Sequence, residues 1–194
     1  RAAPGAIERV RINPKNFEAR YKVIGSDLWS NDPKFRDSIK KIGVTGICGS
    51  GIIETVAEMY LAGIINEDGL IIDSETLQTE KVINNGRTFS YVLSKGTPDI
   101  IITQNDIRAI QLAKAALYAG AKLLMDKLNI KQIDKIRFAG AFGSHIDVKY
   151  AMILGMIPDC VIENVSSAGN AASTGARMAL LDTDSRDEIQ KETL

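Results

Sequence analysis

Apolar residues recur at helical spacing in two long stretches of the chain. In residues 52–62 the apolar positions fall on one helical face, and Gly63 follows where a helix would end. A second helix is expected from a cap at Asn105 or Asp106 to about Leu128. Its apolar stripe consists of Ile107, Ile110, Ala113, Leu117, Ala121, Leu124 and Leu128. These two stretches predict the main helices of the protein.

Shorter patterns predict strands before and between these helices. Residues 6–12 alternate apolar and charged side chains, although imperfectly, and residues 20–24 form a second candidate strand. The turn signal at residues 84–87 separates two strand-like runs and predicts a β-hairpin. Residues 99–103, with three consecutive isoleucines, are typical of a short buried strand.

The second half of the chain alternates helices with strands. Ile136, Phe138 and Ala139 predict a strand, and a short helix is expected to follow Asp147. Residues 160–165 are expected to form another strand, and residues 177–181 another helix. The order helix, strand, helix, strand, helix implies parallel strands joined by helical crossovers. The charged residues 182–194 are expected to form a helical or frayed terminus.

Two glycine-rich segments separate a strand from a helix. The first contains Gly140, Ala141, Phe142 and Gly143. Backbone N–H groups at such a turn can receive a nucleotide, because no Cβ blocks close approach and a helix N-terminus favours anionic oxygens. A tight turn without a ligand is the alternative interpretation. Residues 168–176, rich in Gly and Ala, predict close helix packing, either at a hinge between lobes or in an ordinary contact.

The second glycine-rich segment, residues 43–51, leads directly into the helix at residues 52–62. Its glycines cost backbone entropy, so either phosphate or ribose binding or tight helix packing is expected to require them. Cys48 stands where a helix dipole makes a thiol more acidic, or it is simply a small apolar side chain in a crowded loop.

Composition narrows the function classes. The 194 residues carry 24 basic and 24 acidic side chains, a balance that argues against nucleic acid or an anionic membrane as partner. Apolar stretches fall short of the roughly 20 residues that a bilayer span requires. Two separated cysteines and one histidine argue against a protein-only zinc site or iron–sulfur cluster. A cytoplasmic, reduced protein is the expectation, and an opening without methionine suggests a piece of a longer protein or processing.

Several segments together resemble the C-terminal ATPase domain of reductive activators of corrinoid proteins. They read G-I-C-G-S-G-I-I-E-T-V-A-E at 46–58, T-Q-N-D-I-R-A-I-Q-L-A-K-A-A at 103–116 and F-A-G-A-F-G-S-H-I-D at 138–147, with A-G-N-A-A-S-T-G-A at 168–176 and the opening residues in support. Those proteins belong to the acetate kinase, sugar kinase, heat-shock chaperone and actin superfamily. The resemblance implies an α/β fold: part of a ribonuclease H-like ATPase subdomain, with a mixed sheet, helical crossovers and a small β-rich N-terminal portion.

The resemblance also implies a function and a site. The chain would be the nucleotide-binding part of an ATP-dependent activator that restores the cob(I) state of a corrinoid partner protein. Residues 140–143 would be the adenosine motif, and Gln111 and Lys114 would flank the adenine. A second nucleotide-facing loop would contain Gly46, Cys48, Gly49, Ser50 and Gly51. ATP or ADP with Mg²⁺ is the implied cofactor, and an iron–sulfur cluster is expected only in a domain that this chain lacks.

The chain departs from such ATPases in lacking their phosphate-binding aspartate-glycine hairpins. Catalytic carboxylates are therefore unknown, because capping or solvent exposure explains Asp99, Asp106 and Asp147 more simply. We expect residues 1–98 and 99–194 to form the two portions of one compact domain that hydrolyses ATP poorly by itself. A homodimer is possible. The alternatives are a protein-docking module without nucleotide, or part of a small-molecule kinase of the same superfamily.

Overall fold

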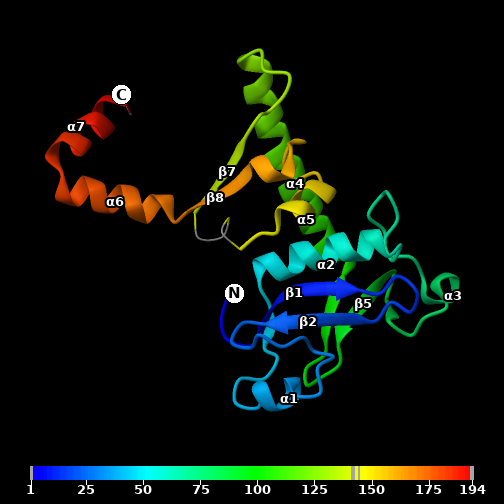
Figure 1. Ribbon diagram of the computed structural model, residues 1–194. Coiled ribbons are helices and arrows are strands. Elements are labelled where there is room, and N and C mark those ends of the chain that lie inside the picture. The colour runs from blue at the N-terminus through cyan, green and yellow to red at the C-terminus, as the bar shows by residue number, and fades with distance from the viewer. Residues whose placement is uncertain (1, 141–142, 144, 193–194) are drawn as a thin grey trace.

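The computed structural model describes residues 2–140, 143 and 145–192 (Figure 1). Within them the elements in chain order are β1 (Ala6–Ile12), β2 (Ala19–Val23), α1 (Phe35–Ser38), β3 (Gly46–Ile47), α2 (Gly49–Leu61), α3 (Ser74–Leu77), β4 (Val82–Asn85), β5 (Thr88–Ser94), β6 (Ile100–Thr103), α4 (Gln104–Lys127), β7 (Ile136–Ala139), α5 (Val148–Ile153), the 3₁₀ turn η1 (Ile162–Asn164), β8 (Val165–Gly169), α6 (Ala171–Leu181) and α7 (Thr183–Glu192).

The first sheet has the order β2-β1-β3 and confirms the strand expected at the start of the chain. β1 pairs antiparallel with β2, and its register shifts between Ile7 and Arg9. This β-bulge at Glu8 explains the imperfect alternation of the sequence, because one extra residue moves the following side chains to the opposite face. Val10 and Ile12 are therefore buried with Ile7 on one face, whereas Arg9 and Arg11 lie on the other.

The helix α2 follows the two-residue strand β3 and runs along β1. Nine of its residues are buried, including Glu54 and Glu58. Gly63 lies just beyond its end at φ +76°, the left-handed conformation expected of a glycine that terminates a helix. α2 is therefore a central core element.

A second sheet, with the antiparallel order β4-β5-β6, contains the predicted hairpin. Its strands contribute Tyr91 and Ile102 to the main core, which they share with Val10 of β1 and Met59 of α2. The next helix, α4, starts earlier than expected: Thr103 is the N-cap, and Asp106 closes a capping box with it. Only Gln104 and Ile107 of α4 are buried, so most of its predicted apolar stripe is exposed.

The second half is built on two parallel strands, β7 and β8, joined through α5 as expected. The strand predicted at residues 160–165 is wrong, because η1 occupies residues 162–164 and β8 runs from Val165 to Gly169. The helix α6 begins at Ala171, inside the small-residue segment 168–176, and continues through the expected residues 177–181.

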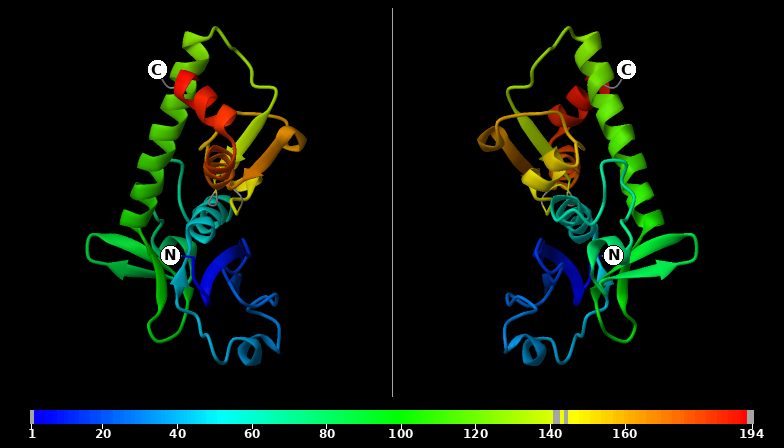
Figure 2. Two further views of the ribbon diagram at one scale, coloured as in Figure 1. Left: turned by 90° about the vertical axis from the view of Figure 1, so that its left-hand side faces the viewer. Right: turned by 90° about the vertical axis from the view of Figure 1, so that its right-hand side faces the viewer.

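Helices α6 and α7 stand away from the rest of the chain (Figures 1 and 2). A Cβ built on Gly175 would meet no atom within 4 Å, so the close helix contact expected from residues 168–176 is not formed in this structure. None of the helices in the described part of the chain is long and apolar enough to cross a membrane.

Candidate functional site

The two glycine-rich segments lie on the same side of the molecule. Ile53 in the first turns of α2 shares a hydrophobic cluster with Tyr150 of α5 and Phe138 of β7. The N-terminal end of α2 consequently lies near the carboxyl ends of β7 and β8 in both views (Figures 1 and 2). Two segments far apart in the sequence thus lie on the same side of the molecule (Figure 1).

The segment before α2 is held tightly against β1. The Cys48 amide donates to the Ile7 carbonyl at 3.0 Å. A Cβ on Gly51 would lie 2.2 Å from the same carbonyl oxygen, so no larger residue fits without displacing backbone. Cys48 and Ser50 are buried, with Sγ and Oγ 3.2 Å apart. Helix packing therefore accounts for Gly51, and Cys48 is a small buried side chain.

The N-terminus of α2 carries backbone N–H groups that are not bonded within the helix. Cys48 is the N-cap residue but makes no side-chain cap hydrogen bond, and the first turn contains no acidic residue. The first N–H groups of a helix have no partner within the helix, and the helix dipole places partial positive charge there. The amides at Gly49, Ser50 and Gly51 thus form an electropositive end, next to the half-buried Gly46.

The segment after β7 contains one glycine with open space around it, Gly140, and one packed against a neighbour, Gly143. Gly140 has φ +103° and donates its amide to the Gly169 carbonyl at 2.7 Å. A Cβ there would meet nothing within 4 Å, whereas a Cβ on Gly143 would lie 2.9 Å from that of Phe138. Ala141 and Phe142 lie outside the described residues. Gly140 is therefore required for its conformation and leaves open space beside it.

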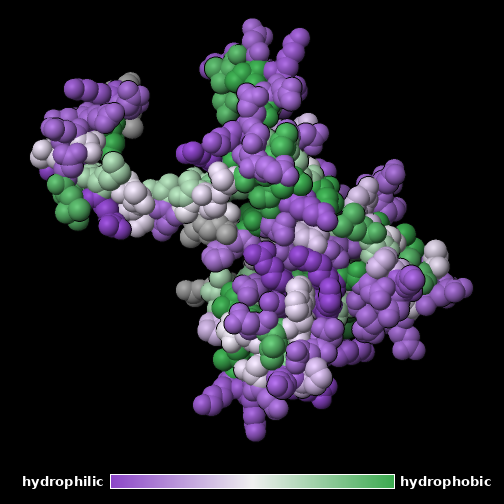
Figure 3. All heavy atoms as spheres, viewed as in Figure 1, coloured by the Kyte–Doolittle hydropathy of each residue, from purple (hydrophilic) through white to green (hydrophobic). Residues whose placement is uncertain are grey.

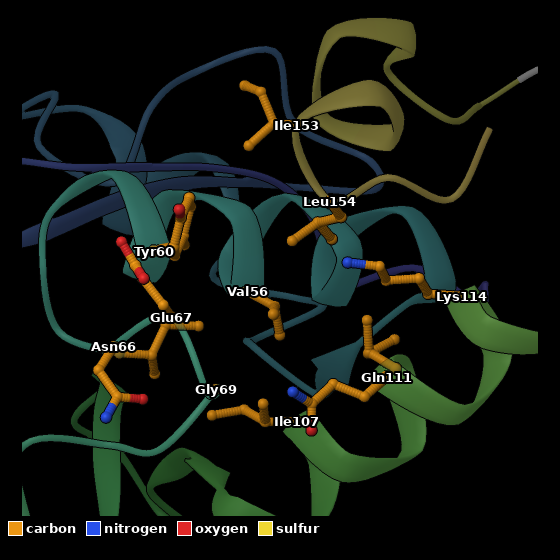
Figure 4. A pocket seen from close by; sticks show the side chains of 12 residues that line it. Val56, Tyr60, Asn66, Glu67, Gly69, Ile107, Gln111, Lys114, Ile153 and Leu154 are labelled. Atoms are coloured by element: carbon orange, nitrogen blue, oxygen red, sulfur yellow. The ribbon is translucent and has the colours of Figure 1, made fainter. Parts of the chain in front are cut away.

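Gln111 and Lys114 line a different place, a pocket of about 160 Å³ between α2, α4 and α5 (Figure 4). Val56, Ile107 and Leu154 supply apolar walls. The Lys114 ammonium points toward the cavity from α4, and Tyr60 and Glu67 stand on the opposite wall (Figure 4). Tyr60 follows Gly49 by eleven positions, about 16 Å along a helix, so this pocket does not include the glycine-rich segment before α2.

Gln111 has a structural task that the sequence did not reveal. Its Nε2 donates to the Asp68 carbonyl at 3.1 Å, and Arg108 donates both to that carbonyl and to Gln111 Oε1. One helical face also carries Gln104, whose Nε2 donates to the Gly69 carbonyl at 2.7 Å. Because these residues are spaced at i, i+4 and i+7, they hold the loop before Ile71 against α4.

Two buried glutamates on α2 form polar contacts that the sequence analysis missed. Glu54 is fully buried and accepts hydrogen bonds from Arg9 at 2.6 Å, the Val10 amide at 3.0 Å and Arg11 at 2.7 Å. The strand β3 pairs with β1 over only two residues. The later amides along that edge of β1 therefore require acceptors from outside the sheet. Glu54 and, one turn later, Glu58 supply them, the latter to the Ile12 amide at 2.7 Å.

Glu58 also connects the two halves of the chain. Its Oε1 accepts a hydrogen bond from the hydroxyl of Tyr150 on α5. Burial, followed by the bond to Glu58, raises the pKa of Tyr150 above its ordinary value. The protonated tyrosine is therefore a hydrogen-bond donor that ties α5 to α2 and, through Glu58, to β1.

The three candidate aspartates have local roles, as the sequence suggested. Asp106 belongs to the capping box of α4, and Asp147 accepts from the Lys149 amide at the start of α5. Asp99 accepts from the Gly96 amide at 2.7 Å. No group of three metal-ligating side chains occurs among the described residues. Catalytic carboxylates and a protein-only metal site are therefore not assigned.

Comparison with known proteins gives concordant matches. A family model described as the C-terminal domain of RACo, the ASKHA domain, matches residues 1–193. The chain is 38% identical over 193 residues to the corrinoid activation enzyme RamQ of Eubacterium limosum, covering 93% of this chain and 30% of that protein. It is also similar to a solved structure of a reductive activator for corrinoid, iron-sulfur protein, with a TM-score of 0.81, 33% identity, and coverage of 98% of this chain and 29% of that one. The chain thus spans less than a third of the length of these relatives.

Proposed function

Because the chain belongs to the family of C-terminal ASKHA domains of RACo, we propose that it is the nucleotide-binding part of an ATP-dependent reductive activator. The complete protein would restore the cob(I) state of a corrinoid protein, in line with the names of its relatives. The observation that carries the proposal is the approach of the α2 N-terminus to the glycine-rich end of β7, which the shared cluster of Ile53 and Phe138 produces.

The described residues fit the anionic part of a nucleotide. The uncapped first turn of α2 presents amides to phosphate oxygens, and Gly140 leaves room for a ribose or phosphate to approach the backbone. The proposed nucleotide contacts are Gly46, Cys48, Gly49, Ser50, Gly51 and residues 140–143. The pocket lined by Gln111 and Lys114 is a proposed adenine site.

The residues described here do not fit a magnesium site by themselves, since no cluster of ligating side chains occurs among them. Mg²⁺ in phosphoryl transfer shares its ligands with the phosphates and a few carboxylates. We therefore assign Mg²⁺ ligation, and with it efficient ATP hydrolysis, to the longer activator and not to the described residues of this chain. The iron–sulfur cluster of the proposed electron path is assigned there too, because Cys48 and Cys160 are separate free cysteines and Cys48 is buried.

The proposed mechanism is coupling through a change of relative position. A ligand shifts a two-state equilibrium only as far as it binds the two states differently. Glu58 is a suitable link, because one carboxylate joins the Ile12 amide in the first half to Tyr150 on α5. Nucleotide bound at the start of α2 would act on this link, and partner binding would respond to the same movement.

Isothermal titration of the full-length protein with ATP and ADP tests the proposal. Saturable binding is expected, and Gly140→Ala is expected to weaken it by roughly tenfold or more, since the new Cβ enters the space assigned to the ligand. Gly86→Ala is the matched control, because Gly86 also has positive φ (+68°) and open space around a Cβ.

Equal affinity in both variants would exclude residues 140–143 as a nucleotide contact. Absence of any ATP or ADP binding would instead favour the second candidate, a protein-docking module whose glycines serve packing. The close approach of Gly51 to the Ile7 carbonyl is the observation in favour of that candidate.

A further inference from the structure

Four cations form a two-by-two array on the outer face of the first sheet. In the pairing of β1 with β2, Arg9 lies opposite Lys22, and Arg11 lies opposite Arg20. The bulge at Glu8 places both arginines of β1 on this face. Directly opposed like charges destabilise a sheet, so this arrangement requires compensation or has a use.

One buried carboxylate compensates half of the array. Glu54 binds Arg9 and Arg11 at 2.6 and 2.7 Å, and the carboxylate of Asp147 on α5 interacts electrostatically with Arg9. The cations of β2 are not part of this pairing. Arg20 is exposed and Lys22 is half-buried, so the side of the array away from α2 carries excess positive charge.

Aromatic rings hold the cations in place. The ring of Trp29 lies 5.1 Å from the Arg20 guanidinium, 5.5 Å from the Lys22 ammonium and 5.8 Å from the Arg11 guanidinium. The Arg11 guanidinium also lies 4.9 Å from the ring of Tyr150. Cation–π contacts at these distances orient the charged groups without neutralising them. The surface is therefore ordered before any partner arrives.

A pocket of about 430 Å³ adjoins the array and is lined by Arg11, Arg20, Asn13 and Asn31. The acidic residue at its rim, Glu18, forms an ion pair with Lys81 at 2.9 Å. Figure 3 shows strongly hydrophilic side chains gathered over β1 and the adjoining part of α2. Arginine forks and side-chain amides in a concave site suit a carboxylate, which they can bind through two hydrogen bonds.

We infer that this face, defined as Arg9, Arg11, Arg20, Lys22 and Trp29, docks an acidic segment of a protein partner. The inference rests on the proposed function in naming that partner as the corrinoid protein. Tryptophan and arginine together are typical of the residues that dominate binding energy at protein interfaces. The balanced charge of the whole chain, 24 basic against 24 acidic residues, favours a local protein contact over nucleic acid.

The test compares two charge reversals in the full-length activator. Arg20→Glu with Lys22→Glu reverses the cations that do not bind Glu54, so the buried carboxylate keeps its partners. Lys40→Glu with Lys41→Glu is the control, because it changes the net charge equally at exposed positions near α1. The rate of association with the corrinoid protein is measured over a range of salt concentrations, together with ATP affinity and the unfolding midpoint.

The array variant is expected to associate roughly tenfold more slowly at low salt and to lose most of the salt dependence, with ATP affinity unchanged. The milder pair Arg20→Gln with Lys22→Gln is expected to show an intermediate effect, which keeps the test valid if the reversal unfolds the protein. The control is expected to behave like the unaltered activator.

Three results would overturn the inference while leaving the proposed function intact. The first is unchanged association of the array variant with the corrinoid protein, and the second is an equal loss of association in the control. The third is an array variant that has lost affinity only for an added single-stranded RNA oligonucleotide. Failure of the unaltered activator to bind and reduce the corrinoid protein is a different result, because it overturns the proposed function itself.

Discussion

The two halves of the chain differ in how completely they bury their apolar residues. In the first half, two small sheets and α2 enclose a continuous core, with Tyr91 and Met59 fully buried. In the second half, Leu112, Leu123 and Leu180 are 73%, 70% and 78% exposed. The two strands β7 and β8 offer too little surface to bury the apolar faces of the long helix α4 and of the later helices α6 and α7. The first half is therefore stabilised by its own contacts, and the second half much less so.

The largest effect is expected from Glu54→Ala in the first half. The change leaves Arg9, Arg11 and the Val10 amide without their acceptor, and removing one partner of a buried ion pair costs about 3–5 kcal/mol. Urea unfolding should show this loss, whereas Glu188→Ala at an exposed position of α7 should stay within about 0.5 kcal/mol. Similar stability of the two variants would contradict the role of Glu54.

Two helical glycines, Gly51 in the first half and Gly175 in the second, allow the packing of the two halves to be compared directly. Gly51→Ala should destabilise the protein by about 1–3 kcal/mol, because the new Cβ would lie 2.2 Å from the Ile7 carbonyl oxygen. Gly175→Ala in α6 meets open space and should be neutral or stabilising by about 0.5–1 kcal/mol. Thermal unfolding of both variants checks the signs, and a stabilising Gly51→Ala would refute the packing of α2 on β1.

The link between the halves should depend on Tyr150. Tyr150→Phe leaves one Glu58 oxygen without its buried donor, at a cost of about 1–3 kcal/mol. Urea unfolding monitored separately by probes in α2 and in α5 would check this prediction. Unaltered stability would show that Glu58 does not connect the halves.

Alkaline pH should destabilise the folded state through two tyrosines, Tyr150 and Tyr91. The pKa values of Tyr150 and Tyr91 are raised, first by burial, so the folded state holds these protons more tightly than the unfolded state. This contribution is present below the ordinary tyrosine pKa of about 10 and is lost as pH rises toward the folded-state values. Urea midpoints measured from about pH 9 to about pH 11 should fall, and less steeply in Tyr150→Phe. Identical slopes would contradict the assignment.

The smallest effect is expected at an exposed leucine of the second half. Leu123→Gln should change the unfolding free energy by no more than about 0.5 kcal/mol. Leu93→Gln, the same substitution at a residue that is only 4% exposed, should cost about 3–5 kcal/mol. Comparable losses at both positions would mean that the apolar face of α4 is buried in solution.

The sequence predicted most elements of the fold, whereas the nucleotide site stays a prediction. Sequence patterns located α2, α4, the hairpin and β7, and family membership confirms the expected α/β fold. The pattern at residues 160–165 failed because an apolar run does not distinguish a strand from the 3₁₀ turn that η1 forms. A homodimer and a cytoplasmic location stay predictions.

Long-range polar contacts were beyond the sequence. Glu54 and Glu58 were not identified from the sequence, because nothing local shows that β3 is too short to satisfy the amides of β1. The array on the first sheet depends on strand register and on a bulge, which pair Arg9 with Lys22 and Arg11 with Arg20. Gln111 illustrates the same limit, since its partner is the Asp68 carbonyl in a distant loop.

Hydrogen exchange of the full-length protein, with and without MgATP, tests whether nucleotide binds at the two glycine-rich segments. We expect slower exchange at the amides of Gly49, Ser50 and Gly51 and at Gly140 when nucleotide is bound, and little change in the distant hairpin of β4 and β5. Unaltered exchange at both glycine-rich segments, under conditions where ATP is bound, would contradict it.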